Sequence, residues 1–327
     1  MAQPHIPITP STTTFEGKTI IVTGANAGLG LEAARQFLTL HASRVILACR
    51  SLTKGRDAAT YLSTHPSVVA VNSNADIKVL ELDLDDYKSV TKFAQQIKSE
   101  IDVLDVLLLN GGVNIMEYQV SASGHERVMQ VNYLSNAVLS LELLPLLQST
   151  AAKRGAPSRL TLVGSQTMGM HALVKKPLLE NETITQRWDD KTRYGSLQRY
   201  SDSKLMVAAF TQVLAQHVPA SKVVINNLCP GIVATGFDVN LPIWLKPIMW
   251  VVRKARARTV EEGARTLIYA SGVAQADSHG KFILNNVITE PAPILAQPEG
   301  EKLKQKAWAE AVAQVKELDP GFNRDWA

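Results

Sequence analysis

The chain has 327 residues, of which 46% are hydrophobic and 20% charged, with a formal net charge of +4. This composition is ordinary for a globular protein and can supply a core without disulfides or metals. The basic residues are scattered, so nothing in the charge pattern indicates a nucleic-acid partner. The densest basic cluster, Arg253–Arg258, is expected to be a solvated helix face.

Residues 1–15 are polar, rich in Pro and Thr, and expected to be flexible; they lack the apolar core of a signal peptide. A cytoplasmic location is therefore the default expectation. Cys49 and Cys229 each end an apolar run and are expected to be buried thiols, and no Cys/His cluster has metal-ligand spacing. The apolar stretch 241–252 is too short to span a bilayer.

Taken in chain order, short runs rich in Val, Ile and Leu alternate with segments of helical periodicity. The predicted strands are 18–23, 44–49, 77–82, 103–109, 159–163 and 222–228. The predicted helices are 28–41, 53–64, 86–100, 124–149, 198–217 and 260–271. Continuously apolar strands must be covered on both faces, so the alternation predicts one α/β domain, residues 16–327, with a doubly wound parallel sheet between helix layers.

Two segments, 166–196 and 238–258, interrupt this alternation. Long loops in a compact α/β domain are uncommon unless they shape a site, so both are expected to flank a substrate. The apolar centre of the second, 241–252, is expected to be a substrate lid, a buried packing helix or a weak membrane contact. A helical pattern at Glu301–Glu317 is expected to pack on the same domain.

A glycine-rich turn, TGANAGLG, follows the first predicted strand. Glycine lets the chain turn sharply and lets backbone N–H groups approach a pyrophosphate, while the next helix directs its positive end at the anion. An ordinary turn is the alternative, but the strand–turn–helix context favours a dinucleotide site. The expected contacts come from Thr23, Gly24, Asn26, Gly28, Leu29 and Gly30.

Arg50 ends the second predicted strand. An acidic residue at this place bonds the ribose 2′-OH of NAD, whereas a basic one accommodates a 2′-phosphate. Arg50, with Lys54 nearby, therefore predicts NADP(H); a plain surface arginine is the alternative.

Tyr200 and Lys204 are four positions apart, so they share one face of the predicted helix. A nearby cation lowers the pKa of a phenol, which can then exchange a proton with a carbonyl or an alcohol. Ser165 follows the fifth predicted strand, where its hydroxyl can bond a substrate oxygen. A surface pair is the alternative for Tyr200 and Lys204, and Thr167 is the alternative for Ser165.

The ordered motifs TGxxxGxG, Asn110-Gly111-Gly112, Asn132, Ser165, YxxxK and Pro230-Gly231 resemble the short-chain dehydrogenase/reductase family. The resemblance to the family runs over about residues 16–285, and the tail EGEKLKQKAWAEAVAQVKELDPG also resembles its retinol-dehydrogenase-like and fungal biosynthetic members. The resemblance implies a Rossmann-type fold with Tyr200 as general acid/base, Lys204 lowering its pKa and binding ribose, Ser165 orienting the substrate oxygen, and Asn132 in a proton relay.

The resemblance also implies contacts to the cofactor beyond the glycine-rich turn. These residues are Asp83 and Leu84 at the adenine, Asn110 and Gly111 at the ribose, and Pro230, Gly231, Val233 and Thr235 at the nicotinamide. Asp83 could instead cap the next helix, and Asn132 could be a buried structural amide. Two departures stand out: Leu109 replaces the first Asn of the family's Asn-Asn-Ala-Gly turn, and Ser165 and Tyr200 are separated by 200 − 165 = 35 positions.

Together these features predict NADP(H)-dependent reduction of a carbonyl, or the reverse oxidation of a secondary alcohol, on a hydrophobic small molecule such as a polyketide or terpenoid intermediate. A non-redox isomerase or cyclase and an NADP-sensing regulatory protein are the alternatives. Family members often dimerise through the long helices after the fourth and fifth strands, so a homodimer or a monomer is expected.

Overall fold

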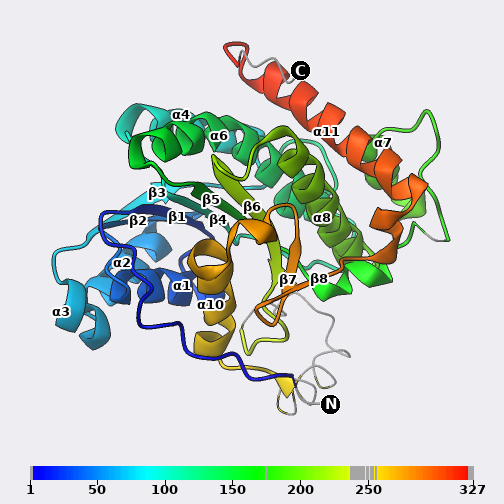
Figure 1. The fold of residues 1–327 in the computed structure, drawn as a ribbon. Coiled ribbons are helices and arrows are strands. Elements are labelled where there is room, and N and C mark those ends of the chain that lie inside the picture. The colour runs from blue at the N-terminus through cyan, green and yellow to red at the C-terminus, as the bar shows by residue number, and fades with distance from the viewer. Residues whose placement is uncertain are drawn as a thin grey trace.

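The computed structural model describes residues 3–173, 175–235 and 256–322, together with Pro247, Trp250 and Lys254. Within this part of the chain an eight-stranded sheet has the order β3-β2-β1-β4-β5-β6-β7-β8 (Figure 1). The strands are β1 Thr19–Thr23, β2 Arg44–Cys49, β3 Asp76–Glu81, β4 Val106–Leu109, β5 Ser158–Val163, β6 Val223–Cys229, β7 Phe282–Leu284 and β8 Val287–Thr289. The six predicted strands are confirmed.

Strands β1 to β7 pair in parallel, and β8 pairs antiparallel with β7. The predicted strands are thus parallel, as expected, and β8 is an antiparallel edge strand that the sequence did not predict. Only Asn285 and Asn286 separate the two strands, both with positive φ (54° and 61°). A two-residue turn of this kind closes an antiparallel hairpin, because a parallel connection needs a long crossover.

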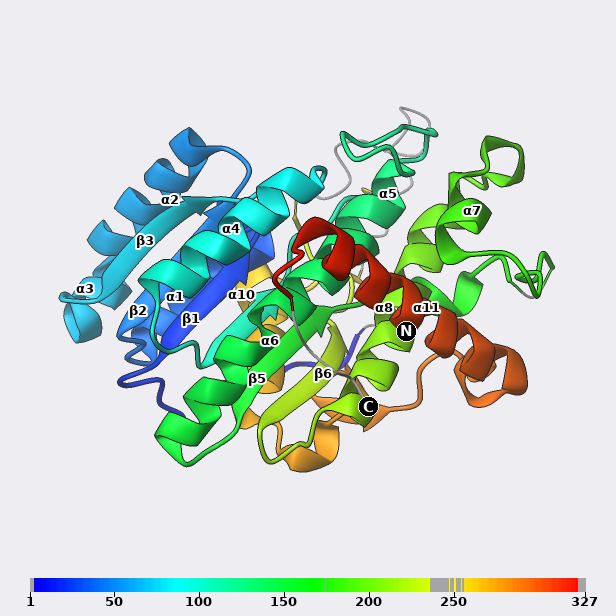
Figure 2. The ribbon, with the colours of Figure 1, turned by 90° about the horizontal axis from the view of Figure 1, so that it is seen from above.

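Helices cover both faces of the sheet, as predicted (Figures 1 and 2). One layer contains α1 Gly28–Thr39, α2 Leu52–Thr64, α3 Pro66–Asn72 and α10 Val260–Ile268. The other contains α4 Tyr87–Glu100, α5 Arg127–Met129, α6 Ser135–Arg154, α8 Arg199–His217 and the C-terminal α11 Pro298–Leu318. The strand order reverses between β1 and β4, and ligands of open α/β sheets bind at such a switch point.

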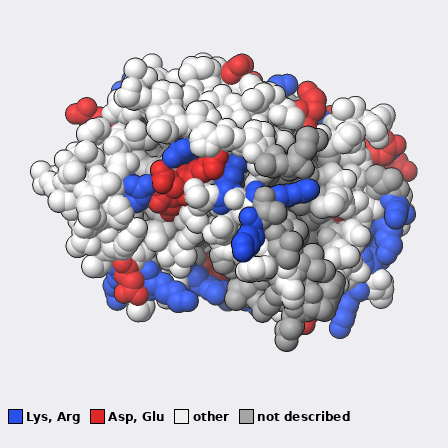
Figure 3. Space-filling view, turned by 90° about the horizontal axis from the view of Figure 1, so that it is seen from below, with Lys and Arg blue, Asp and Glu red and all other residues white. Residues whose placement is uncertain are grey.

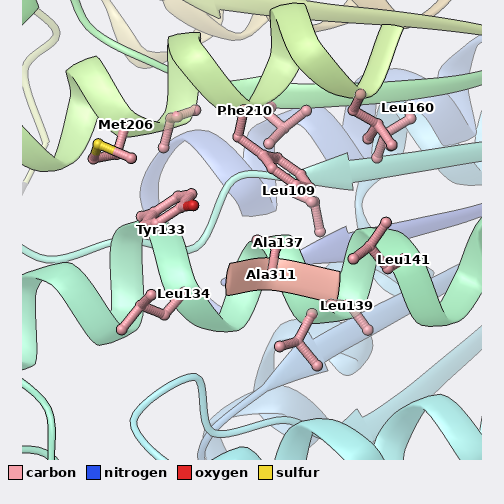
Figure 4. Close-up of a cluster of buried hydrophobic side chains, with 14 of the residues drawn as sticks. Leu109, Tyr133, Leu134, Ala137, Leu139, Leu141, Leu160, Met206, Phe210 and Ala311 are labelled. Carbon is pink, nitrogen blue, oxygen red and sulfur yellow. The ribbon is translucent and has the colours of Figure 1, made fainter. Parts of the chain in front are cut away.

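The core of the second layer is closed by α11. Figure 4 shows Leu109 and Leu160 from the sheet, Tyr133 and Phe210 from helices that cover it, and Ala311 from α11 in one buried cluster. The hydroxyl of Tyr133 donates to the carbonyl oxygen of Ala307 on α11 at 3.2 Å. The expected packing of the C-terminal helix on the same domain is therefore confirmed.

The predicted helix 124–149 has an internal irregularity. Between α5 and α6 the residues Gln130–Leu134 form one wide π-helical turn, and all five are buried. Such turns often lie at functional sites because they redirect a side chain. Here the turn carries Asn132.

The segment 166–196 is more ordered than the expected loop. It contains α7 Ile184–Asp189 and two 3₁₀ turns, Gln166–Met170 and Lys191–Arg193. Thr183 caps α7 in a reciprocal capping box with Gln186. These elements span one or two turns each, too short to show as a hydrophobic period in the sequence.

The N-terminal segment from residue 3 lies along α10 (Figure 1). Ile6 is fully buried, its N–H donates to Glu262 and its carbonyl oxygen accepts from Arg265. The segment expected to be flexible is thus hydrogen-bonded in this structure. The expectations for 238–258, including the apolar stretch 241–252, fall largely outside the described residues.

Candidate active site

Three glycines shape the turn after β1. Gly24 and Gly28 have positive φ (65° and 56°), which other residues adopt at a cost. A Cβ on Gly24 would lie 2.9 Å from the Cα of Gly111, and a Cβ on Gly30 would collide with the carbonyl oxygen of Gly24. The turn therefore presents bare backbone at the start of α1, as a phosphate cradle requires.

The turn after β4 is tied to this cradle. Asn110 Nδ2 donates to the carbonyl oxygen of Thr23 at 2.9 Å, and the N–H of Gly111 donates to the Thr23 hydroxyl, also at 2.9 Å. Thr23, through these hydrogen bonds, and Gly30, through its close approach to Gly24, thus fix the backbone of the cradle. Asn110 makes this hydrogen bond although Leu109 replaces the Asn that precedes it in the family's turn.

A cavity of about 540 Å³ extends from the cradle toward β2 and β3. Its lining comprises Gly24, Asn26, Arg50, Leu82, Asp83, Leu84, Asp85, Gly111, Val113, Ile115, Glu117, Gln119, Arg127 and Val131. Arg50 is exposed there, whereas Lys54 lies in the first turn of α2 and does not contribute to the lining.

The alternative role for Asp83, a helix cap, is wrong. Asp86 is the residue that caps α4, because its carboxylate accepts the N–H of Lys88 at 2.9 Å. Asp83 accepts instead from the N–H of Asp85 at 3.0 Å and stays at the cavity wall.

A second cavity of about 570 Å³ lies at the ends of β4, β5 and β6. It shares Gly24, Asn26 and Gly111 with the first. Its other lining residues are Ala27, Gly28, Leu29, Asn110, Gly112, Asn114, Val163, Gly164, Ser165, Thr167, Tyr200, Lys204, Cys229, Pro230, Gly231, Ile232, Val233 and Thr235. Of the predicted site residues, Thr23, Gly30, Lys54 and Asn132 line neither cavity. Each of the others lines at least one of the two adjoining cavities.

Lys204 is buried at the base of the second cavity. Its Nζ donates to the carbonyl oxygen of Val163 at 2.8 Å and lies 5.6 Å from the centre of the Tyr200 ring. Burial lowers the pKa of Lys204 to about 8, although the nearby Cys229 raises it. The predicted pairing of Tyr200 and Lys204 on one helix face is present.

Asn132 reaches the same place from the π-helical turn. Its Oδ1 accepts from the N–H of Val113 at 2.7 Å, and its Nδ2 donates to the Val113 carbonyl oxygen and to Ser203 Oγ, both at 2.9 Å. A Cβ on Gly112 would lie 3.0 Å from Asn132 Oδ1 and 3.7 Å from Lys204 Nζ. Asn132 therefore holds the loop after β4 and borders the same glycine as Lys204.

Ser165 and Thr167 both line the second cavity. Thr167 donates its hydroxyl to Ser165 Oγ at 2.9 Å and its N–H to the same oxygen at 3.2 Å. Because Ser165 Oγ accepts both bonds, its own hydrogen is available to point into the cavity. The geometry thus gives the two side chains different parts, with Thr167 orienting Ser165.

A buried charge network behind Tyr200 was missed by sequence reasoning. Glu126 and Arg199 form an ion pair at 3.1 Å, with side chains 0% and 1% exposed. Glu126 also accepts from the first N–H groups of α5, and Asp189 of α7 accepts the N–H of Glu126 at 2.8 Å. Arg199 adjoins Tyr200, but no sequence pattern indicates a partner 73 positions away (199 − 126 = 73).

The lower face of the molecule carries charges of both signs, and Figure 3 shows basic and acidic side chains lying side by side there. Among the described residues, no helix is both long and apolar enough to cross a membrane, and no group of His, Cys, Asp and Glu is arranged to hold a metal ion.

A glycine cradle at the switch point of a doubly wound sheet, next to a buried Lys and a Tyr, defines the class of dinucleotide-binding oxidoreductases. A model of the short chain dehydrogenases matches residues 18–168. The chain is 52% identical over 289 residues to short chain dehydrogenase sor7 of Hypocrea jecorina, covering 88% of this chain and 80% of that protein. It is 41% identical over 316 residues to short-chain dehydrogenase/reductase tropG of Talaromyces stipitatus, covering 97% and 96%.

Among solved structures, the active-site complex of Pseudomonas aeruginosa RhlG with NADP is similar, with a TM-score of 0.61 and 25% identity over 83% of this chain and 96% of that one. The chain belongs to the short-chain dehydrogenase/reductase family and is an oxidoreductase of the CH–OH/C=O pair. The predicted family and the predicted Rossmann-type fold are confirmed.

Proposed function

We propose that this protein is an NADP(H)-dependent enzyme that reduces a carbonyl, or oxidises a secondary alcohol in the reverse direction, on a hydrophobic small molecule. The observation that carries the proposal is the buried Lys204 ammonium beside the Tyr200 ring, in a cavity continuous with the glycine cradle. A cation at this place stabilises a phenolate and so equips Tyr200 for proton transfer.

The residues present fit a nicotinamide dinucleotide, which supplies or accepts a hydride when bound. The backbone of Gly24 and Gly28 suits the pyrophosphate, because side chains at these positions would be strained or crowded. Arg50 at the wall of the first cavity suits a 2′-phosphate, since a guanidinium binds phosphate oxygens in pairs. The similar RhlG structure is a complex with NADP, which supports the same choice.

The protein's own residues then divide the work of proton transfer. Tyr200 gives a proton to the carbonyl oxygen, and the hydroxyl of Ser165 donates a hydrogen bond to that oxygen as charge develops on it. Lys204 donates one N–H to Val163 and keeps two for the ribose and the relay. Asn132, which borders Gly112 together with Lys204, completes the relay that restores the Tyr200 proton.

The substrate is proposed to be apolar and bulky, such as a polyketide or terpenoid intermediate. Support comes from Val163 and Ile232, apolar residues that line the second cavity. Residues 166–196 bring Thr167 to the same wall, so this segment is positioned to select the substrate.

Loss of NADPH absorbance against a panel of hydrophobic ketones and aldehydes tests the proposal, with NADH in parallel. Tyr200→Phe should reduce kcat by about 10²- to 10⁴-fold, the usual worth of a general acid, while still binding NADPH. Turnover confined to small polar carbonyls, or a preference for NADH, would contradict the proposal. A rearranged product formed without NADPH consumption would indicate a non-redox isomerase or cyclase.

A further inference from the structure

Gln3 contacts the turn that follows β6. Its Nε2 donates to the carbonyl oxygen of Ile232 at 2.8 Å and to that of Arg256 at 2.6 Å, and its Oε1 accepts from the N–H of Ile232 at 2.9 Å. One carboxamide thus satisfies both main-chain groups of Ile232, as a neighbouring strand would. Ile232 lines the second cavity, so this contact holds a residue of the cavity wall.

Arg258 strengthens the same contact from the other side. It is only 4% exposed, and its guanidinium donates to the carbonyl oxygens of Pro4 at 2.7 Å and Pro230 at 3.0 Å, and to Asn285. Its backbone pairs with the turn, because its N–H donates to the Ile232 carbonyl oxygen at 2.9 Å. The expectation that Arg258 lies on a solvated helix face is therefore wrong: the side chain joins the N-terminal segment to the turn.

The N-terminal segment is itself anchored to a rigid element. Ile6 is fully buried, its N–H donates to Glu262 at 2.7 Å and its carbonyl oxygen accepts from Arg265 at 3.2 Å. Both partners belong to α10, which packs against α1. Ile8, two positions further on, is 76% exposed, so the anchored part is short.

The turn needs such support because of its own backbone. Gly231 has a φ of +81° and an added Cβ there would collide with Gln3 and Arg258, so these side chains lie directly against it. Gly231 and Ile232 lie beyond the last residue of β6, where the sheet no longer supplies hydrogen-bond partners. Gln3 and Arg258 supply them instead.

We infer that residues Gln3–Ile6, here called the strap, position the wall of the second cavity formed by Pro230–Val233. The inference rests on the proposed function, in which this wall flanks the nicotinamide end of NADP(H). By holding the wall in its binding conformation before the cofactor arrives, the strap removes an ordering cost from binding. The first cavity has no strap contact among the described residues, so the adenosine end of the cofactor is expected to bind independently of it.

Paired titrations test the inference. NADPH probes both cavities, whereas adenosine 2′,5′-bisphosphate lacks the nicotinamide and probes the first alone. In Gln3→Ala, which removes three hydrogen bonds, the Kd for NADPH should rise about tenfold and that for the bisphosphate should change less than about twofold. Gln96→Ala is the matched control, because Gln96 makes one exposed hydrogen bond, to Glu100, on α4.

Melting curves show whether a change in Kd comes from lost folding stability instead of from the lost contact. Gln3→Ala leaves Ile6 in place, so its Tm should stay within about 4 °C of the unaltered protein, the shift that a loss of 1 kcal/mol gives in a large domain. Equal weakening of both ligands, or an unchanged Kd for NADPH, would overturn the strap. An unaltered protein that binds the bisphosphate but not NADPH would instead contradict the proposed function.

Discussion

Lys204 combines deep burial with a positive charge. It is 4% exposed, and this burial removes water from around the ammonium, which disfavours the charged form. Its pKa is lowered to about 8, so the group is still mostly charged at neutral pH. The residue therefore presents a cation to Tyr200 under ordinary conditions and loses it within the mildly alkaline range.

This pKa predicts the alkaline side of the pH profile. Because the cation exists below a pKa of about 8 and disappears above it, kcat/KM for carbonyl reduction should fall as the pH rises through about 8. Initial rates with NADPH between about pH 6 and pH 9.5 measure the effect.

Lys204→Arg provides the control, because a guanidinium keeps its charge throughout this range. The variant is expected to be slower, but its rate should not fall near pH 8. A flat profile of the unaltered protein, or a fall near pH 8 that persists in the variant, would contradict the assignment.

Single residues were predictable where a strand end or a motif marks them. Arg50 and Ser165 were predicted at strand ends and Tyr200 from its four-residue spacing to Lys204, and all three line the cavities as expected. Gln3 and Glu126 could not be found this way, because their partners are 229 and 73 positions distant and neither belongs to a periodic pattern. Their contacts depend on how whole elements pack.

At the scale of elements, the Glu126–Arg199 pair joins the helices that carry the proposed catalytic residues. Glu126 caps α5, which leads into the π-helical turn, and Arg199 begins α8. Burial raises the pKa of Glu126, against the opposing effects of Arg199 and of the N–H groups at the start of α5. Removing one partner should therefore cost much folding free energy, because the other charge would stay buried and unpaired.

Arg199→Met should lower the free energy of unfolding by about 3–5 kcal/mol at neutral pH, because it leaves a buried carboxylate without its cation. The loss should be smaller at about pH 5. A carboxyl whose folded pKa is raised favours folding while it is protonated, and this benefit is lost as the pH rises through that pKa. Urea unfolding at the two pH values measures both effects.

Arg44→Met is the matched control. Arg44 pairs with Asp76 at 2.6 Å, but both side chains are more than 30% exposed (34% and 41%), so the same substitution should cost no more than about 1 kcal/mol. Equal losses in the two variants, or a loss in Arg199→Met that does not depend on pH, would refute the role given to burial.

Elements were predictable from sequence in proportion to their length. The six long strands and the main helices show clear periodicity, whereas β7 and β8 have three residues each and α7 has six. The helix α3 begins at Pro66, directly after its cap His65, and was missed although proline at the first position is a helix signal. Its seven residues are too few for a hydrophobic period to be recognised.

At the scale of the whole molecule, α11 covers the surface that family members often use for dimerisation. Figure 2 shows it running across α6 and α8, the long helices after β4 and β5. Its buried face includes Leu303, Ala307 and Val315. The same helix holds the inserted segment, because Glu310 accepts from the N–H groups of Ile184 and Thr185.

The covered face predicts a monomer in solution. Sedimentation equilibrium at micromolar concentration should give the mass of one chain. Leu303→Asp places a charge under α11 and should destabilise the protein by several kcal/mol, about the cost of burying an unpaired charge. Lys316→Asp on α11 is the control, because Lys316 is exposed. A stable dimer of the unaltered protein would contradict this prediction.

The contact between Gln3 and Ile232 spans 229 positions of the chain, which matters while the protein is being made. Synthesis runs from the N-terminus, so Gln3 leaves the ribosome long before Ile232 exists. All residues that line the first cavity have been synthesised once Val131 has emerged, whereas the strap must wait for the turn and for Arg258. The residues proposed to bind the adenosine end of the cofactor are therefore available in the nascent chain well before the contact that holds the wall of the second cavity.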